Sequence, residues 1–399
     1  MRVDLLGTVA GAAEGMSRLA ARVEYAGAGL EPDCLWIEVE QELAPQASRS
    51  GNPFLVGLLP LAMALGEPLE IVGPLDPVLL RNAYRVQRIW RTWYPELHMV
   101  ALSGQGDAPA ATPAAAAVFF SGGVDSFYTL LREDPHGPSP GQEVDDLILI
   151  AGMDITIGHP DAFALARANL AAAADALGKR LTVVRTNLRQ TRWNITNWAR
   201  LSHGSLLAMA ALALEGRYRL VFVPSSVGYR LAPPWGSHPL VDPLFGTRSL
   251  EIRYDGSDAD RTRKVACIAQ SPIALRHLRV CWQSQSGQNC GACEKCLRTM
   301  VALELAGALA RCEAFPAERR ELQPLGRLHL YDSVRFRGWR RLAAAAANTG
   351  RHDLARRIDK AISRSLWRSG AALVARAVGR VSPWLGGRLE RLVWHGIIR

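Results

Sequence analysis

Short apolar runs alternate with helical patterns through the middle of the chain. Four continuous apolar runs have the length of buried strands: residues 118–120, 147–151, 181–185 and 220–223. Helical patterns lie between them at residues 126–133, 160–177 and 203–215. Strands that are apolar throughout and alternate with helices predict an α/β fold, in which helices cover both faces of a Rossmann-like parallel sheet. Ligands bind such sheets beyond the carboxyl ends of the strands.

The first hundred residues carry a different pattern. Residues 35–39 have the composition of a strand, and residues 54–65 form an apolar helical stretch. A second helix is expected to begin near Asp76, because an aspartate followed by proline caps a helix well. We expect a small α+β domain over residues 1–102. The linker expected after it, residues 103–117, is rich in Ala, Pro, Gly and Ser.

Two further parts complete the predicted organisation. Residues 118–312 form the α/β domain, and residues 313–399 form a basic helical extension. In this extension Leu354, Ile358 and Ile362 are spaced along one helical face.

The net charge of +10 is unevenly distributed. Residues 351–399, the basic C-terminal segment, hold eleven Arg or Lys and three acidic residues, which leaves 36 basic and 34 acidic residues before them. Such a segment fits nucleic acid or an anionic lipid surface, or a helix whose arginine face is simply solvated. We favour the solvated face and keep nucleic acid as the alternative.

Hydropathy and cysteine use indicate the compartment. No run approaches the roughly 18 apolar residues that span a bilayer, and the start lacks the basic and apolar regions of a signal peptide. We therefore expect a cytoplasmic protein with reduced thiols. The oligomeric state stays open, and a homo-oligomer is compatible with the sequence.

A candidate phosphate-binding motif follows the first apolar strand. It consists of six consecutive residues: Ser121, Gly122, Gly123, Val124, Asp125 and Ser126. The motif opens a helical pattern, where backbone N–H groups and the helix dipole favour phosphate. The serine hydroxyls can donate to phosphate oxygens, whereas the Asp125 carboxylate fits a Mg²⁺ ion. The pattern predicts bound Mg-ATP.

This segment resembles the SGGxDS signature of the N-type ATP pyrophosphatases, or PP-loop enzymes. The superfamily includes GMP synthetase, asparagine synthetase, NAD synthetase, tRNA thiolation enzymes and 7-cyano-7-deazaguanine synthase. The resemblance implies transfer of AMP from ATP to a carboxylate or carbonyl oxygen with release of pyrophosphate. A nitrogen or sulfur nucleophile then attacks the activated group. Neither the Walker pattern G-x-x-x-x-G-K-[ST] nor G-x-G-x-x-G occurs in the chain.

Four cysteines cluster within a short polar segment. Cys281, Cys290, Cys293 and Cys296 follow the spacing C-x8-C-x2-C-x2-C. Four thiolates with two such short spacings fit a closed tetrahedral zinc site, with an iron–sulfur cluster as the minor alternative. The array is similar to that of the 7-cyano-7-deazaguanine synthase family, in which it also follows the pyrophosphatase core. The resemblance covers roughly residues 115–310.

A loop after the last apolar strand carries the candidate substrate residues. Tyr229 and Trp235 could stack on a planar substrate. His238 could move a proton, and Asp242 could orient His238 or bind metal. Each also has a plain role as a loop anchor. The family's own substrate loop differs from this segment, so the resemblance is a guide to the activation step more than to the substrate.

Three more residues are candidates for ATP contacts. Asp154 follows the second apolar strand and would face the site, although it could equally cap a turn. His203 opens a helix and could contact phosphate or pack. Lys264, with its basic neighbours, could reach the released pyrophosphate or belong to a solvated basic patch.

The residues and the resemblance together predict an ATP-dependent enzyme that forms an amide, a nitrile or a conjugate from a small-molecule substrate. No glutaminase signature is present, so ammonia or another nitrogen donor would supply the nucleophile. A tRNA-modifying enzyme of the thiolation type and a non-catalytic ATP-sensing adaptor are the two alternatives.

Overall fold

The computed structural model describes residues 1–381 apart from residues 28, 109–110, 135–138, 285, 321 and 331–332. The chain divides into two compact units. Unit 1 comprises Met1–Arg279 and Gln285–Gln288, and unit 2 comprises Val280–Ser284 and Asn289–Arg399.

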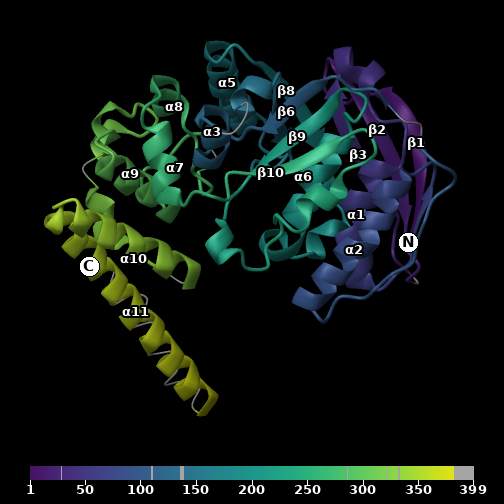
Figure 1. The fold of residues 1–399 in the computed structure, drawn as a ribbon. Coiled ribbons are helices and arrows are strands. Elements are labelled where there is room, and N and C mark those ends of the chain that lie inside the picture. The colour runs from purple at the N-terminus through teal and green to yellow at the C-terminus, as the bar shows by residue number, and fades with distance from the viewer. Residues whose placement is uncertain are drawn as a thin grey trace. The chain divides into compact units, whose positions relative to one another are not determined.

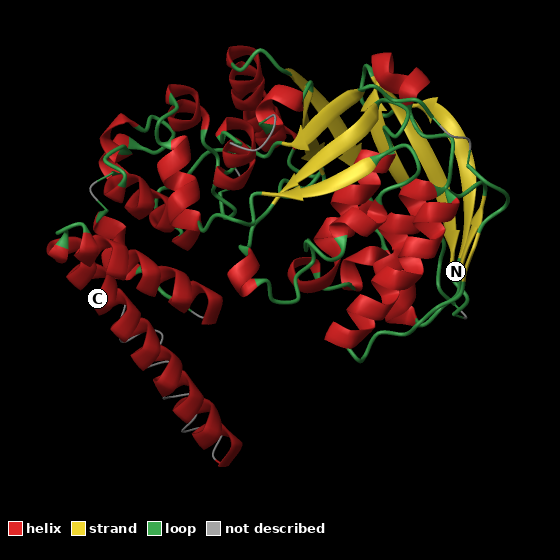
Figure 2. Ribbon diagram, in the orientation of Figure 1, coloured by secondary structure: helices red, strands yellow, loops and turns green. Residues whose placement is uncertain are grey.

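Unit 1 is built on one sheet (Figure 1, Figure 2), whose described strands run in the order β10-β9-β6-β7-β8-β3-β2-β1-β4-β5. The strands are β1 (Arg2–Ala10), β2 (Met16–Glu24), β3 (Asp33–Glu40), β4 (Leu69–Val72), β5 (Leu102–Ser103), β6 (Ala115–Phe119), β7 (Asp146–Ala151), β8 (Arg180–Thr186), β9 (Tyr218–Pro224) and β10 (Glu251–Asp255). Strands β10, β9, β6, β7 and β8 are mutually parallel. The four predicted apolar strands correspond to β6 to β9, so the α/β class with a mostly parallel sheet is confirmed.

The N-terminal strands extend this same sheet. Strand β3 pairs antiparallel with β8, with Ile37 opposite Thr186 and Val39 opposite Val184. Residues 1–102 therefore contribute to unit 1 instead of forming a sheet of their own, and residues 115–117 of the expected linker begin strand β6. The structure divides the chain near residue 280. Composition alone does not reveal this division, because backbone pairing between distant strands leaves no local signal.

Helices cover both faces of the sheet. They are α1 (Asn52–Leu65), α2 (Pro77–Trp93), α3 (Val124–Leu131), α4 (Pro140–Glu143), α5 (Pro160–Ala176), α6 (His203–Leu212), α7 (Arg261–Ile268) and α8 (Pro272–His277). One face carries α1, α2 and α6, whose apolar residues share a core with the strands. On the other face α3 and α5 contact strands β6 to β9. The carboxylate of Asp76 accepts from the N–H groups of Val78 and Leu79, which confirms the predicted start of α2.

Unit 2 is helical in the residues that the structure describes. It contains α9 (Glu294–Leu305), α10 (Ser333–Asn348) and α11 (His352–Val381). Helices α10 and α11 pack together, and Leu354, Ile358 and Ile362 are buried on α11 as their spacing predicts. Within the described part of the chain, no helix is long and apolar enough to cross a membrane.

Candidate functional site

The six-residue motif forms the turn between strand β6 and helix α3. Gly122 has φ of 72°, and a Cβ built on it would lie 2.5 Å from Leu170 Cδ2. Only glycine fits this position, because a side chain would be strained and would collide with helix α5. Gly123 caps α3 without a side-chain hydrogen bond. The first-turn N–H groups of a helix lack intrahelical acceptors, so this turn is suited to an anion.

The two serines of the motif differ in their hydrogen bonds. Ser121 Oγ accepts from the Gly123 N–H at 3.3 Å, so its own proton is not used in that bond. The buried Ser126 hydroxyl donates to the Gly123 carbonyl at 3.0 Å and thereby stabilises the turn. In this conformation Ser121 is the better donor to a bound phosphate.

Asp125 lies in the first turn of α3 and binds two cations from α7. Its Oδ2 lies 2.9 Å from Arg261 Nη1, and its Oδ1 lies 3.1 Å from Lys264 Nζ. The buried Lys264 Nζ also donates to the carbonyl and the hydroxyl of Ser225, which follows strand β9. Lys264 therefore connects the motif to the end of β9. The expectation that Lys264 contacts the released pyrophosphate stays a prediction.

A second group of predicted residues gathers at the start of helix α6. The His203 ring lies 6.3 Å from the Trp235 ring and 5.7 Å from the Trp198 ring. Its Nδ1 donates to the Trp198 carbonyl at 3.0 Å, which leaves Nε2 as the acceptor of a neutral ring. Burial lowers the pKa of His203, while the hydrogen bond to Trp198 and the nearby Asp154 carboxylate act in the opposite direction.

His238 and Asp242 also come together, but through the backbone. The Asp242 carboxylate accepts from the Ser237 hydroxyl and from the His238 main-chain N–H, and the latter distance is 3.1 Å. The imidazole of His238 instead accepts from the Leu240 N–H and packs edge-on against Trp93 at 4.7 Å. Asp242 therefore orients the loop rather than the ring of His238.

Asp242 is fully buried beside the N-terminus of α6. A Cβ built on Gly204 would lie 2.9 Å from Asp242 Oδ1. Burial raises the pKa of Asp242 from its ordinary value of 3.8 to about 7, although the two hydrogen bonds from Ser237 and His238 oppose this change. A carboxyl group that titrates near neutrality can hold or release a proton under ordinary conditions.

Tyr229 stands apart from this group. The residue is 62% exposed, and its main-chain N–H donates to the Ser257 carbonyl at 2.8 Å. Among the two predicted stacking residues, Trp235 is the one that lies beside other site residues.

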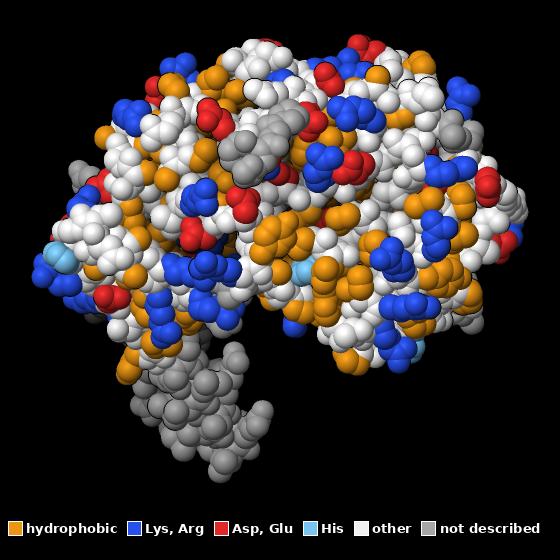
Figure 3. All heavy atoms as spheres, in the orientation of Figure 1, with side chains coloured by type: hydrophobic (Ala, Val, Ile, Leu, Met, Phe, Trp, Pro, Cys, Tyr) orange, Lys and Arg blue, Asp and Glu red, His pale blue; other side chains and the backbone are white. Residues whose placement is uncertain are grey.

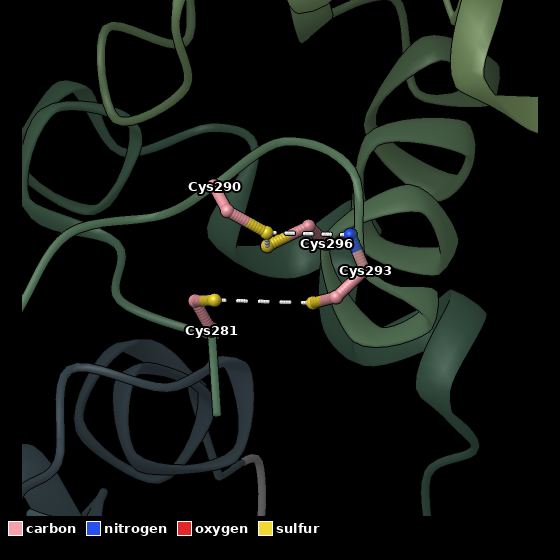
Figure 4. Close-up of side chains that lie close together, drawn as sticks. All are labelled: Cys281, Cys290, Cys293 and Cys296. Atoms are coloured by element: carbon pink, nitrogen blue, oxygen red, sulfur yellow. Dashed lines mark hydrogen bonds between the residues drawn. The ribbon is translucent and has the colours of Figure 1, made fainter. Parts of the chain in front are cut away.

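The four cysteines of unit 2 bring their sulfurs together (Figure 4), and all ligand atoms lie within 4.8 Å of one another. The Sγ atoms of Cys281 and Cys293 are 3.9 Å apart, and those of Cys290 and Cys296 are 4.0 Å apart. Sulfurs around one tetrahedral ion at a bond length of about 2.3 Å lie about 3.8 Å from one another. The cluster therefore fits a single metal ion such as zinc.

Backbone groups around the cluster support thiolate ligands. The N–H groups of Ala292 and Cys293 donate to Cys290 Sγ at 3.4 and 3.3 Å, and the Ser284 N–H donates to Cys281 Sγ at 3.2 Å. Gly291 has φ of 65°, and a Cβ there would lie 2.7 Å from the Arg319 Cβ. Outer hydrogen bonds of this kind orient metal ligands.

The thiols of the cluster change one another's pKa. Hydrogen bonding from Cys293 lowers the pKa of Cys281, and the proximity of Cys281 raises the pKa of Cys293 to about 11 and also raises that of Cys296. Four sulfurs so close together cannot all ionise unless a cation offsets their charge. A metal ion bound by the four sulfurs would supply that charge.

Sequence reasoning missed one charged residue beside the motif. The N–H of Arg279 donates to the Gly122 carbonyl at 2.7 Å, and Arg279 is only 9% exposed. An arginine two residues before a cysteine cluster carries no motif of its own, so only the structure could reveal this position.

Comparison with protein families, with characterised proteins and with solved structures finds no match to this chain. Its class therefore rests on its own residues. The chain is an α/β protein with a mostly parallel sheet, a glycine-rich strand-to-helix turn, and a four-cysteine cluster that can hold a metal ion.

Proposed function

We propose that this chain is an ATP pyrophosphatase of the PP-loop kind, which adenylates a small-molecule substrate for attack by ammonia or another nitrogen nucleophile. The observation that carries the proposal is the turn at Ser121 to Ser126. It joins a central parallel strand to a helix start that has no side-chain cap, and it holds Asp125 against two cations. The resemblance to the SGGxDS signature and to the cysteine array of the 7-cyano-7-deazaguanine synthase family supports the same class.

The reaction would proceed at the α-phosphorus of ATP. A substrate carboxylate or carbonyl oxygen attacks this atom, and the bond to the oxygen that bridges the α- and β-phosphates breaks. Pyrophosphate then leaves with its electron pair. The turn's N–H groups and the Ser121 hydroxyl would bind the departing group, where their dipoles oppose the developing charge.

The carboxylate of Asp125 is a suitable ligand for Mg²⁺. The side chain of Asp125 is 23% exposed, so a hydrated ion can reach its carboxylate. Mg²⁺ commonly takes one or two carboxylates and completes its shell with water and phosphate oxygens. Bound there, the ion would screen the negative charge of the phosphates, while Arg261 and Lys264 hold the carboxylate in place.

Zinc is the metal that we assign to the cysteine cluster. Four sulfurs at this spacing fit one tetrahedral ion, whereas an iron–sulfur cluster of several irons attaches its thiolates to different irons and needs a wider arrangement. With all four positions filled by cysteine, the ion's role is structural.

The group at the start of α6 has side chains suited to contact with a planar substrate. His203 and Trp235 present planar rings beside Asp154 and the buried Asp242. Neutral His203 could accept a proton from the attacking nitrogen through Nε2.

The first prediction tests the site directly. Asp125→Asn keeps the size of the side chain but removes its charge, so turnover should fall on the order of a hundredfold. The measurement is the release of AMP and pyrophosphate from ATP in the presence of cell extract, followed by mass spectrometry of adenylated or condensed products. Asp161→Asn is the matched control, because Asp161 occupies the first turn of α5 and is exposed.

The products of ATP cleavage show whether the proposal is right. AMP and pyrophosphate from the wild-type protein and the Asp161→Asn control, with little from Asp125→Asn, support the proposal. ADP and phosphate as products, or full pyrophosphate release by Asp125→Asn, would show that the proposal is wrong.

A tRNA-modifying enzyme remains the second candidate because of the charge on unit 2. Lys and Arg side chains gather over α10 (Figure 3), where Arg337, Arg340 and Arg341 are exposed. Basic helical surfaces of this kind bind nucleic acid phosphates with a strong dependence on salt. The third candidate, an ATP-sensing adaptor, would bind ATP without releasing pyrophosphate from any substrate pool.

A further inference from the structure

Arg279 is a buried cation without a counter-ion. Only 9% of the residue is exposed, and its Nε is buried without a hydrogen-bond partner. Among the described residues, no hydrogen bond or ion pair joins its guanidinium to another side chain or to a carbonyl. The buried Lys264 instead pairs with Asp125, and two half-buried arginines of unit 1 are also paired, Arg132 with Asp255 and Arg217 with Asp146.

An arrangement of this kind is costly in the free protein. Arginine stays protonated at all ordinary pH values, and it can donate five hydrogen bonds. A buried guanidinium nitrogen without a partner destabilises the fold unless an acceptor offsets it. The arginine is therefore expected to bind an anion that comes from outside the chain.

Arg279 lies beside the glycine turn that precedes helix α3, so we expect the anion to bind at this turn. The N–H of Arg279 donates to the carbonyl of Gly122 at 2.7 Å, and its Cβ lies 3.3 Å from a Cβ built on Gly122. The side chain thus begins beside the turn whose N–H groups open helix α3. A glycine turn at a helix start and an unpaired arginine are two independent features that favour the same ligand, a phosphate group.

We propose that Arg279 is a ligand of the β- and γ-phosphates of ATP and of the pyrophosphate that leaves. This inference rests on the proposed function and adds to it a residue outside the motif. The planar guanidinium can form two parallel hydrogen bonds with a phosphate, which a lysine cannot do. It opposes the charge that develops on pyrophosphate as the bond to the α-phosphorus breaks.

The test compares three variants of the full-length protein by calorimetry and thermal unfolding. The probes are Mg²⁺-pyrophosphate and Mg²⁺ with α,β-methylene-ATP, which cannot be cleaved between the α- and β-phosphates. Arg279→Met should bind both probes about ten- to a hundredfold more weakly, because one or two charge-assisted hydrogen bonds are lost. Its melting temperature without ligand should equal or exceed that of the wild type, since the variant no longer buries an unpaired charge.

Arg217→Met is the matched control. It removes an arginine that is paired with a buried aspartate, so the melting temperature should fall while affinity for both probes is unchanged. Arg279→Lys keeps the charge but not the planar fork, and it should bind several-fold more weakly than the wild type. Should Arg279→Met fail to fold, the Arg279→Lys variant carries the test.

The outcomes separate the two proposals. If the wild type binds neither probe, the proposed function is wrong and this inference is wrong with it. If the wild type binds both probes and the Arg279 variants bind them equally well, Arg279 is not a phosphate ligand and the proposed function stands. Loss of affinity in the Arg279 variants alone supports both.

Discussion

Asp242 is the residue whose burial has the clearest measurable consequence. Its pKa is raised to about 7, so between about pH 4 and pH 7 the folded protein holds a proton that the unfolded chain releases. The free energy of unfolding should therefore decrease as pH rises through this window. Over the whole window this decrease in the free energy of unfolding amounts to at most about 4 kcal/mol.

Asp242→Asn removes this titration while keeping the size of the side chain and an oxygen that can accept from Ser237 or His238. Urea denaturation at pH 5 and pH 8 should show a smaller loss of stability in the variant than in the wild type. The exposed Asp161→Asn variant should keep the wild-type slope. An unchanged slope in Asp242→Asn would show that the carboxyl is ionised across the whole range.

Some residue roles could be predicted from the sequence and others could not. The turn at Ser121 to Ser126 is contiguous, so its position between a strand and a helix follows from local patterns. The contacts of Asp125 with Arg261 and Lys264 span more than 130 positions of the chain. The sequence suggested that Asp242 orients the imidazole of His238, whereas its carboxylate accepts from the main-chain N–H of His238. Sequence alone does not distinguish the two, because a carboxylate can accept from a backbone N–H as readily as from an imidazole.

At the scale of elements, we expect the start of α9 to depend on a metal ion held by the cysteine cluster. Cys293 is the N-cap of α9 and Cys296 lies in its first turn. Cys296→Ser should lose the bound metal and destabilise this part of unit 2, because metal binding and local folding are coupled. Metal content per chain and thermal unfolding, with and without a chelator, measure the two effects.

Cys312→Ser is the control for this prediction. Cys312 is also a fully buried thiol of unit 2, but it lies outside the cluster of four. Its replacement should leave metal content at one ion per chain. Protein that holds stoichiometric iron, or a Cys296→Ser variant that keeps its metal and its stability, would contradict the assignment.

The elements that sequence patterns missed share a physical cause. Strands β6 to β9 are buried on both faces and appear as apolar runs, whereas β1 and β2 mix apolar and charged residues. One face of β2 and β3 carries ion pairs in place of a hydrophobic layer. The fully buried Glu38 of β3 accepts from Arg18 at 2.7 Å and from Arg185 at 2.9 Å. A search for continuous apolar runs passes over such strands.

At the scale of the whole molecule, the described part of the basic C-terminal segment, residues 351–381, packs within unit 2. Leu354, Ile358 and Ile362 are 1%, 0% and 6% exposed, and burying each such side chain contributes about 1.5–3 kcal/mol. Deletion of residues 351–399 should therefore lower the melting temperature and the solubility. Deletion of residues 382–399 alone retains these three side chains and should have a much smaller effect.

Binding assays at several salt concentrations check the same interpretation. If the segment only packs, the intact protein and the shorter deletion should show no salt-dependent affinity for tRNA or anionic vesicles. Tight, salt-dependent binding of tRNA by the intact protein would favour the tRNA-modifying alternative.

The antiparallel pairing of β3 with β8 also has a consequence during synthesis on the ribosome. Ile37 finds its partner Thr186 only after about 150 further residues have been made, which takes on the order of ten seconds at 5–20 residues per second. Strands β1 to β3 can pair with one another during that time, but β3 presents an open edge, and open edges invite pairing with other chains. Newly made N-terminal fragments should therefore be prone to aggregate until β8 emerges, and they are expected to depend on chaperones for those seconds.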